Sequence, residues 1–297
     1  EHMSGFRPIF FPWVLHYKLS QYSDASFVQR PLRRGHFYSF SMTGSRRGDS
    51  IDFWGSLAER DGFTIFSWNV PKGKLSVSRD VKGLSVDSHF IVLDLFIASG
   101  HEDEVMDAYV RLLSLPKRSV KPATGYTSWY NLYNTITQES ILRDLAAFTE
   151  QNIPLDFFQI DDGWERAVGD WLIPNGKFPE GMKPIALSIK KAGYRPGLWL
   201  APFIVEESSL LRVEHPDWIL KDRKGRPVVA GNNPFIWSGY SYSLDIYHPE
   251  VQEYLARVFD TIVHQWGFEM LKLDFLYAAC IIPRWNKSRG RVMSDAM

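Results

Sequence analysis

The sequence has almost no cysteine, no long apolar run and no excess of charge of either sign. Its one cysteine, Cys280, excludes a framework of disulfide bonds. No stretch of about 18 or more apolar residues suggests a membrane-spanning helix, and no signal peptide is visible. Lysine plus arginine balance aspartate plus glutamate at 34 each, without a basic block, which argues against a nucleic-acid-binding surface. We therefore expect a cytoplasmic protein with neither nucleic acid nor membrane as a partner, and leave a homo-oligomer open.

Aromatic residues, in contrast, are abundant. Phe, Trp and Tyr make up 15% of the 297 residues, and 11 of them are tryptophans. Aromatic rings line sugar-binding clefts, and they also fill large apolar interfaces. The composition alone leaves both uses open.

The first part of the chain has the pattern of antiparallel strands separated by polar turns. The strand-like stretches are residues 36–42, 51–60, 63–70, 74–80 and 89–99. Short strands with regular turns, such as the polar segment 44–50, are typical of two sheets packed as a sandwich. Residues 102–115 follow, with Val105 and Tyr109 at helical spacing. We therefore predict a partial antiparallel β-sandwich with a connecting helix over residues 1–115.

Two prolines and three basic residues make 116–122 a predicted linker, and the pattern changes after it. Strands and helices then alternate, which favours a parallel sheet with right-handed crossovers. The strands are expected at 125–131, 154–160, 195–203 and 269–275, the last apolar enough for burial on both faces. The helices are expected from Thr135, with Gln138 as its capping partner, over 182–193, and over 249–267. A long connection precedes the last helix.

Charged and aromatic residues occur where three of these strands end. Asp161 and Asp162 follow the second strand, Trp199 ends the third, and Lys272 and Asp274 end the fourth. Residues i and i+2 of a strand point to the same side, so Lys272 and Asp274 face the same way. In a barrel of parallel strands, side chains at the carboxyl ends of the strands converge on one active site. A single aspartate would be better explained as a buried ion pair or a helix cap, but the whole set predicts an active site.

Seven short motifs support this prediction. They are SWY (128–130), FQIDDGW (158–164), GDW (169–171), PGLWLAPF (196–203), EHPDW (214–218), YSLD (242–245) and LKLDFLYAA (271–279). In order and in spacing they resemble the motifs of the α-galactosidases of glycoside hydrolase family 36, the melibiases. The resemblance is strong over residues 126–279 and loose over residues 36–115. It implies an α/β fold, a (β/α)8 TIM-type barrel preceded by a β-sandwich.

The resemblance also implies a retaining exo-glycosidase that hydrolyses terminal α-linked galactose from oligosaccharides such as melibiose or raffinose. Asp274 matches the family's nucleophile, which forms a covalent glycosyl-enzyme. Lys272 would favour the charged form of Asp274 and would also bind sugar hydroxyls. No metal or organic cofactor is implied, because carboxylates perform the chemistry. The isolated histidines His215 and His248 show no zinc-like spacing.

Substrate-binding roles are implied for four further residues. Asp161 and Asp162 match the acidic pair that binds the O4 and O6 hydroxyls of galactose, a task suited to carboxylate acceptors. Trp199 and Trp129 match rings that line the sugar pocket. For both tryptophans, packing in the core stays open as the alternative.

The pattern stops short of a complete barrel. Only four strand–helix units precede Met297, whereas a closed barrel needs eight, so residues 123–297 are expected to be its first half. A retaining enzyme needs a second carboxyl group as acid/base, which in the family lies beyond the motif around Asp274. We expect it past Met297 and assign the role to neither Glu206 nor Glu207. This chain alone is accordingly expected to be poorly active.

Three alternatives stay open at this stage. A transglycosylase of the raffinose-synthase kind would share the covalent intermediate and exclude water from the second step. An α-N-acetylgalactosaminidase would differ in the room near the 2-position of the sugar. A carbohydrate-binding protein without catalytic activity is the alternative outside the enzymes, although the presence of both Asp274 and the Asp161–Asp162 pair speaks against it.

Overall fold

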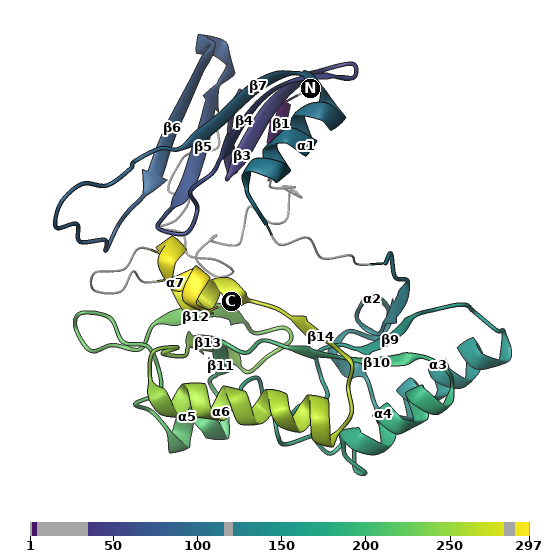
Figure 1. Cartoon of the computed structure of the whole chain (residues 1–297). Helices are drawn as coiled ribbons and strands as arrows, with labels where there is room; N and C mark the ends of the chain where they lie inside the picture. The colour runs from purple at the N-terminus through teal and green to yellow at the C-terminus, as the bar shows by residue number, and fades with distance from the viewer. Residues whose placement is uncertain (1, 5–34, 116–120, 282–288, 297) are drawn as a thin grey trace. The chain divides into compact units, whose positions relative to one another are not determined.

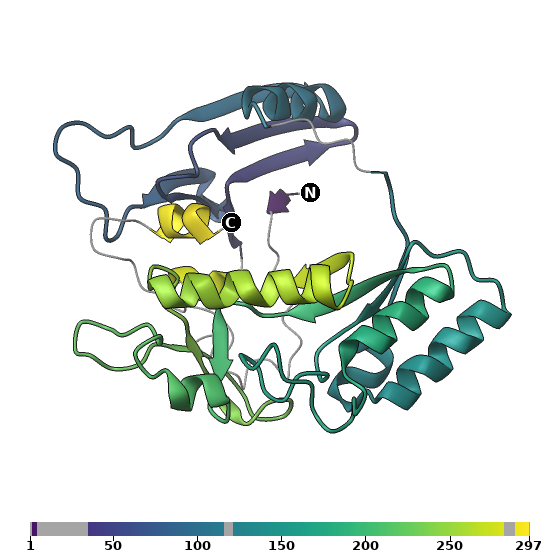
Figure 2. The same cartoon turned by 60° about the horizontal axis from the view of Figure 1, so that its bottom comes forward.

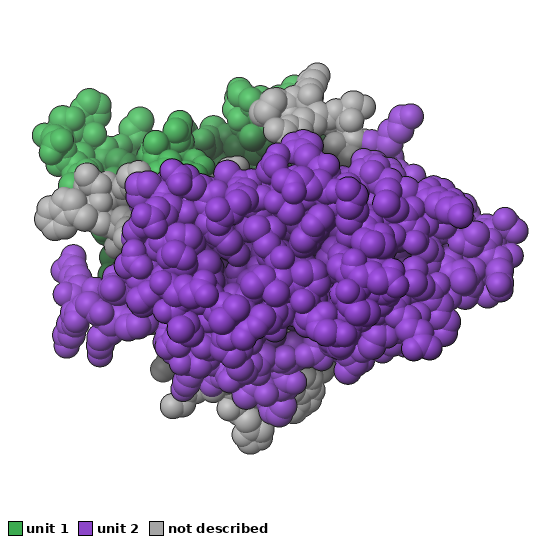
Figure 3. All heavy atoms as spheres, turned by 90° about the horizontal axis from the view of Figure 1, so that it is seen from below, with its two compact units in different colours: residues 1–19, 24–119, 280–297 green, residues 20–23, 120–279 purple. Residues whose placement is uncertain are grey.

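The computed structural model describes residues 2–4, 35–115, 121–281 and 289–296. These residues form two compact units, which are coloured separately in Figure 3. The first unit consists of residues 2–4, 35–115, 280–281 and 289–296, and the second consists of residues 121–279. Most of the predicted linker, residues 116–120, lies outside the described residues.

The first unit is built from two antiparallel sheets (Figure 1). Four strands lie in the order β1-β3-β4-β7 and three in the order β2-β5-β6. Their bounds are β1 His2–Ser4, β2 His36–Phe40, β3 Met42–Arg47, β4 Ser50–Ser56, β5 Phe63–Asn69, β6 Lys74–Asp80 and β7 Leu95–His101. The predicted antiparallel arrangement is therefore confirmed.

Several strand bounds in this unit were predicted wrongly. The strand predicted over 89–99, for example, runs from Leu95 to His101. The sequence predicted a single strand over 36–42 and a turn over 44–50. The chain instead changes sheets at Ser41, whose φ of 64° breaks the strand, and β3 then pairs with β4 as far as Arg47 opposite Ser50. Only Gly48 and Asp49 are left for the turn, because the polar residues before them lie in a paired strand.

Helix α1 (Glu102–Leu112) packs on β4 and β7. Val105 and Tyr109 are buried on it together with Ile51 and Phe53 of β4, as the helical spacing predicted. The Tyr109 hydroxyl donates to the Ser56 carbonyl across 2.8 Å, so this buried polar group is satisfied. Helix α7 (Arg289–Ala296) also belongs to the first unit.

The second unit is built around a parallel sheet in the order β14-β10-β9-β8. The strands are β8 Gly125–Thr127, β9 Phe157–Ile160, β10 Arg195–Leu200 and β14 Met270–Leu273, and every neighbouring pair is parallel. Between successive strands run α3 Gln138–Glu150, α4 Met182–Lys191 and α6 Pro249–Asp260 (Figure 2). The predicted alternation is therefore confirmed, and it brings the carboxyl ends of all four strands to the same end of the sheet.

Apolar stripes attach these helices to the sheet. Ile141 on α3, Ile185 and Ile189 on α4, and Val251 and Val258 on α6 are each at most 1% exposed. Each such side chain contributes about 1.5–3 kcal/mol when it is fully buried. Among the described residues no helix combines the length and the apolar character needed to cross a bilayer.

The predicted N-cap of α3 was wrong by two residues. Thr137, rather than Thr135, is the N-cap, and Thr137 and Ser140 exchange side-chain and backbone hydrogen bonds. Thr135 is unavailable because its hydroxyl donates to the Leu132 carbonyl in the preceding turn. The first strand was also predicted too long, since α2 (Trp129–Leu132) begins two residues after Thr127.

Strand β14 is an edge strand among the described residues, pairing only with β10. Leu273 is 41% exposed, and Met270 and Leu271 are only half-buried. The prediction that this strand is buried on both faces is therefore not met in these residues, because an apolar run signals burial without revealing how many neighbours a strand has.

The long connection contains a small sheet that the sequence did not predict. Strands β11 Ile204–Glu206, β12 Val229–Asn233 and β13 Gly239–Ser243 pair antiparallel in the order β11-β13-β12, and the short helix α5 (Leu210–Glu214) lies among them in the chain. The strands are short, and the register shifts between Val229 and Gly231, which blurs the alternation by which strands are recognised. This sheet positions the loop 234–238 at the site described next.

Candidate active site

Lys272 and Asp161 form an ion pair at the carboxyl end of the parallel sheet. The Lys272 ammonium donates to Asp161 Oδ2 across 2.8 Å. Strands β14 and β9 are separated by β10, about 10 Å in all, a gap that the two side chains bridge together. The sequence had expected Lys272 to act on Asp274, two residues away. The partner that it reaches in the structure belongs instead to a different strand.

Asp161 is held from several sides. Oδ2 accepts from the Gln159 amide at 2.9 Å and from the Thr127 hydroxyl at 3.3 Å. Oδ1 accepts from the Asp162 backbone amide at 3.0 Å, and the Asp161 amide itself donates to Ser128 Oγ at 2.9 Å. The side chain is almost completely buried, so this set of donors fixes a carboxylate that water hardly reaches.

Asp162 is also buried, and its donors come from elsewhere. Trp237 Nε1 donates to Asp162 Oδ2 across 2.9 Å, from the loop between β12 and β13. The Asp162 side chain is also hydrogen bonded to that of Glu165. Burial raises the pKa of Asp162, and the charges of Asp161 and Glu206 raise it further, while the hydrogen bonds oppose them.

Asp274 directly follows β14 and has a donor on each oxygen. Trp199 Nε1 donates to Oδ2 at 3.1 Å, and the Phe275 amide donates to Oδ1 at 2.9 Å. The Asp274 amide bonds to the Leu200 carbonyl at 2.8 Å, which extends the pairing of β14 with β10. Phe275 has a φ of 52°, a strained conformation for a residue with a side chain. The carboxylate is therefore held in one orientation by its backbone and by one indole.

Trp199 is packed more tightly than a ring that offers a face to a ligand. It is 2% exposed, and its ring meets that of Trp171 edge-on at 5.8 Å. Its carbonyl accepts from Trp164 Nε1 at 3.1 Å. Core packing, left open by the sequence, thus describes its surroundings, while its predicted place in the sugar pocket stays a prediction.

The SWY motif contributes to the site through its serine. Ser128 Oγ accepts from the Asp161 amide, whereas Trp129 begins α2 and packs edge-on against Tyr133 at 5.2 Å. Trp129 is half-buried. Its predicted role in lining the pocket stays a prediction.

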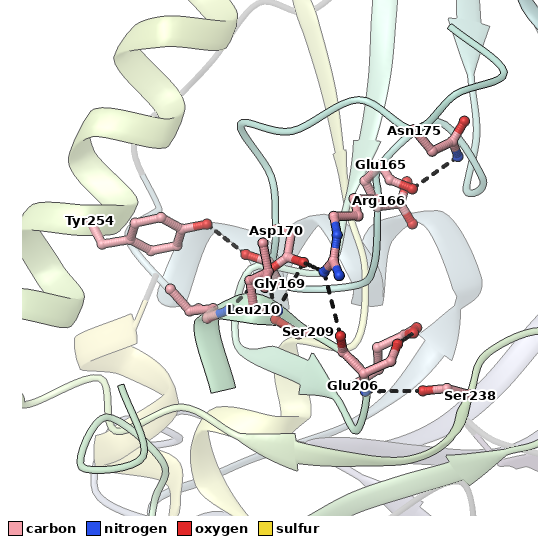
Figure 4. A network of polar contacts seen from close by, with 12 residues as sticks. Glu165, Arg166, Gly169, Asp170, Asn175, Glu206, Ser209, Leu210, Ser238 and Tyr254 are labelled. Atoms are coloured by element: carbon pink, nitrogen blue, oxygen red, sulfur yellow. Dashed lines mark hydrogen bonds and ion pairs between the residues drawn. The ribbon is translucent and has the colours of Figure 1, made fainter. Parts of the chain in front are cut away.

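The GDW motif has a structural task (Figure 4). Asp170 accepts from Ser209 Oγ at 2.7 Å and from the Leu210 and Leu211 amides at 3.0 Å each, and so caps α5 from a distant part of the chain. Its second oxygen also pairs with Arg166 at 2.7 Å. Figure 4 shows Arg166, Ser209 and Leu210 around Asp170, with the Tyr254 hydroxyl donating to the Gly169 carbonyl beside them.

Histidines take part in packing rather than in a metal cluster. His215 stacks on Trp218 with ring centroids 3.9 Å apart, and His248 lies 3.6 Å from Asp217. Within the part of the chain that the structure describes, no three His, Cys, Asp or Glu residues are grouped so that they could hold a metal ion.

Sequence reasoning missed Glu165, Gln159 and Trp237. Glu165 and Gln159 stand next to the acidic pair, in FQIDDGWE, and their polarity inside a buried segment was a usable signal. Trp237 lies 75 residues from Asp162, and only the unpredicted hairpin brings the two together.

The comparisons with known proteins agree with this site. The sequence profile of the Melibiase family matches residues 118–290. An α-galactosidase of Escherichia coli is 26% identical over 170 residues, 55% of this chain and 22% of its own length. The α-galactosidase AgaA of Geobacillus stearothermophilus is 27% identical over 154 residues, 50% of this chain and 20% of its own length. The chain thus spans about a fifth of the length of these curated relatives.

Solved structures extend the similarity into the first unit. An α-galactosidase from Thermus thermophilus, in complex with p-nitrophenyl α-D-galactopyranoside, matches with a TM-score of 0.64 and 35% identity over 87% of this chain and 50% of that one. AgaA matches with a TM-score of 0.59 at 17% identity over 82% of this chain and 38% of that one, which shows the fold alone. These neighbours have a TIM barrel and a β-sandwich, so the predicted fold class is confirmed. The solved relatives include an α-galactosidase of glycoside hydrolase family 36. Because the family profile covers more than half of its residues, this chain belongs to the melibiase family.

Proposed function

We propose that this chain supplies the nucleophile and the galactose-binding residues of a retaining α-galactosidase that removes terminal α-linked galactose from oligosaccharides. The observation that carries the proposal is the placement of Asp274. It stands at the carboxyl end of β14, and both of its carboxylate oxygens accept hydrogen bonds. The Asp161–Lys272 pair lies at the same end of the sheet. A nucleophile that is held in position loses little freedom on reaching the transition state.

In the proposed reaction, one Asp274 oxygen forms a bond to the anomeric carbon while the bond to the leaving oxygen breaks. The leaving oxygen keeps its electron pair and takes a proton from an acid. Water then attacks the same carbon, gives its proton to the base, and releases galactose with Asp274 as a free carboxylate. The donors from Trp199 and Phe275 aim the carboxylate. We assign the acid/base role to no described residue.

Recognition of galactose falls to the buried acidic pair. Asp161 and Asp162 are acceptors for sugar hydroxyls, and the Lys272 ammonium beside Asp161 is a donor. A glucose-configured sugar would leave a buried acceptor without its donor, which costs up to about 10⁴-fold in well-formed sites. The T. thermophilus structures hold p-nitrophenyl α-D-galactopyranoside and stachyose, and a Geobacillus variant holds raffinose. We propose galactose-containing oligosaccharides of this class as the substrates.

Covalent labelling tests the proposal. The complete polypeptide that contains these residues is treated with a galactose-configured, α-selective, mechanism-based inactivator, and the adduct is located by peptide mass. We expect the label on Asp274 and none in the Asp274→Ala variant, whose turnover should fall by orders of magnitude while substrate binding is largely kept. A folded protein that stays unlabelled would contradict the proposal.

A further inference from the structure

Asp162 and Glu165 form a hydrogen-bonded carboxyl pair inside the second unit. Asp162 is 4% exposed and Glu165 is 5% exposed. Their side chains are hydrogen bonded to each other. A carboxylate is only an acceptor, so a bond between two carboxyl groups requires that one of them carry a proton. The pair therefore holds one shared proton.

The charges around the pair favour the same conclusion. Lys177 is the cation whose charge acts on both carboxyl groups, and burial lowers the pKa of its ammonium. The nearby anions Asp161 and Glu206 act on Asp162 with the opposite sign. Lys272 is already paired with Asp161. Two negative charges on Asp162 and Glu165 would face Lys177 and the further anion Glu206 in a buried site, which is costly, whereas one proton on the pair removes one of these negative charges.

The donors around the pair indicate which residue holds the proton. Asp162 Oδ2 accepts a 2.9 Å hydrogen bond from Trp237 Nε1, which stabilises the charged form. Glu165 accepts from two backbone amides, its own and that of Gly163, the latter to Oε2 across a longer 3.3 Å. Burial, followed by the charge of Asp162, raises the pKa of Glu165 well above its usual range. The proton therefore belongs on Glu165, and the negative charge belongs on Asp162.

Glu165 is held rigidly enough to orient its partner. Its carbonyl accepts from the Asn175 side-chain amide at 3.0 Å (Figure 4). The same amide donates to the Gly163 carbonyl at 2.8 Å. An isolated antiparallel bridge joins Glu165 to Pro174. The middle and the last residue of DDGWE, Gly163 and Glu165, are thus tied to the loop near residue 175, so the Glu165 hydroxyl has little freedom to leave Asp162.

We propose that Glu165 is a positioning residue that keeps its proton and donates a hydrogen bond to Asp162, so that Asp162 offers one fixed, charged acceptor to a galactose hydroxyl. This inference rests on the proposed function, because Asp162 must be the residue that meets the sugar. Glu165 itself does not need to touch the substrate. Its task is to hold the orientation and the charge of Asp162.

Two substitutions at Glu165 separate the effect of its hydrogen-bond donor from the effect of its carboxyl group. Glu165→Gln keeps a side chain of the same shape with a donor for Asp162, whereas Glu165→Leu removes the donor. For an α-galactoside, we expect KM of Glu165→Gln to stay within about twofold of wild type. KM of Glu165→Leu should rise about 10- to 100-fold, the loss expected for a hydrogen bond to a charged group. Glu253→Gln, an exposed position on α6, is the matched control and should leave KM unchanged.

A second readout does not depend on activity. Infrared difference spectra of wild type minus Glu165→Gln at pH 7 should show the carbonyl band of a protonated carboxylic acid. The same subtraction with Glu253→Gln should not show it. This comparison decides the protonation even if Glu165→Leu fails to fold.

The outcomes distinguish the two proposals. A wild-type protein that is neither labelled at Asp274 nor active would remove the proposed function, and the infrared band would still report the shared proton. An active wild-type protein without the band would overturn the role of Glu165. So would a Glu165→Gln variant as impaired as Glu165→Leu, or a folded Glu165→Leu variant with wild-type KM.

Discussion

Trp199 Nε1 donates a hydrogen bond to Asp274 Oδ2 across 3.1 Å, although 75 residues separate them in the sequence. The parallel pairing of β10 with β14 makes this contact possible, since it sets Trp199 opposite Lys272, two residues before Asp274. The indole ring is buried, so its nitrogen is committed to the carboxylate. The proposed nucleophile is therefore oriented by the neighbouring strand as well as by its own.

Replacing Trp199 by Phe tests this orientation. The variant keeps an aromatic ring and loses the donor, so we expect turnover and the rate of covalent labelling at Asp274 to fall about 10- to 100-fold, the worth of a hydrogen bond to a charged group. Trp171→Phe is the control, because Trp171 Nε1 is buried nearby and has no hydrogen-bond partner among the described residues. Equal losses in the two variants would mean that ring packing, not the hydrogen bond, matters.

Asp162→Asn should weaken the preference for galactose over glucose configuration. The substitution converts one acceptor oxygen into a donor and removes the negative charge, so the hydroxyl that Asp162 binds loses its partner. Ratios of kcat/KM for matched α-galactosides and α-glucosides measure the effect, and we expect the ratio to fall about 10-fold or more. An unchanged ratio would assign the acidic pair a purely structural role.

Gly163, between Asp162 and Trp164, should tolerate no side chain. Its φ is 110°, and a Cβ there would lie 2.7 Å from the Asn134 carbonyl oxygen, a backbone atom that cannot easily move. Gly163→Ala should therefore destabilise the second unit by about 2 kcal/mol or more, as strain and a backbone clash add. Gly176→Ala is the control, because its added Cβ meets nothing within 4 Å. Urea unfolding followed by tryptophan fluorescence compares them.

The parallel strands and the residues at their ends could be predicted because their signals are local. Apolar runs that stop at Asp161 and Asp274 indicate both a strand and its carboxyl end, and parallel order then brings the two together. The choice of partners could not be predicted. Lys272 reaches Asp161 rather than Asp274 because of strand order and side-chain length, and neither is written in the spacing of the fourth strand.

The part that strands β12 and β13 play in the site could not be predicted from the sequence either. Strands β12 and β13 are short, and a bulge interrupts their alternation. Trp237 therefore lies in a segment whose apolar residues follow neither a strand nor a helix period, although its indole donates a hydrogen bond to Asp162. Its ring also lies 5.2 Å from that of Phe275, next to Asp274. A residue that joins two parts of the site through a long-range contact leaves no trace at short range in the sequence.

Asp170→Ala should lower the free energy of unfolding strongly, while the protein that stays folded should keep most of its activity. The substitution leaves the Leu210 and Leu211 amides without their cap and Arg166 without its anion. We expect a loss of about 2–4 kcal/mol, since several donors lose a buried charged acceptor. Asp260→Ala removes an exposed carboxylate next to His264 and should cost much less stability, because solvent screens this ion pair. Urea midpoints compare the two, and similar midpoints would contradict the capping role of Asp170.

The shared proton of Asp162 and Glu165 should appear as a pH dependence of stability. Burial, the largest cause, raises the pKa of Glu165 well above its ordinary value of 4.5 and also raises the pKa of Asp162. Above about pH 4.5 the unfolded chain releases a proton that the folded chain keeps, so stability is full below that pH and falls as pH rises through the folded pKa.

The fall should reach at most about 1.4 kcal/mol per pH unit for each retained proton. Glu165→Gln has no carboxyl proton to keep at this position, and it also relieves Asp162 of a neighbouring acid. Its stability should therefore fall less steeply with pH than that of wild type. Urea unfolding from about pH 5 to pH 8 measures both slopes, with Glu253→Gln as the control that should follow wild type. Parallel curves for wild type and Glu165→Gln would mean that the folded state keeps no proton on Glu165, and Asp162 would then need another source for its hydrogen bond.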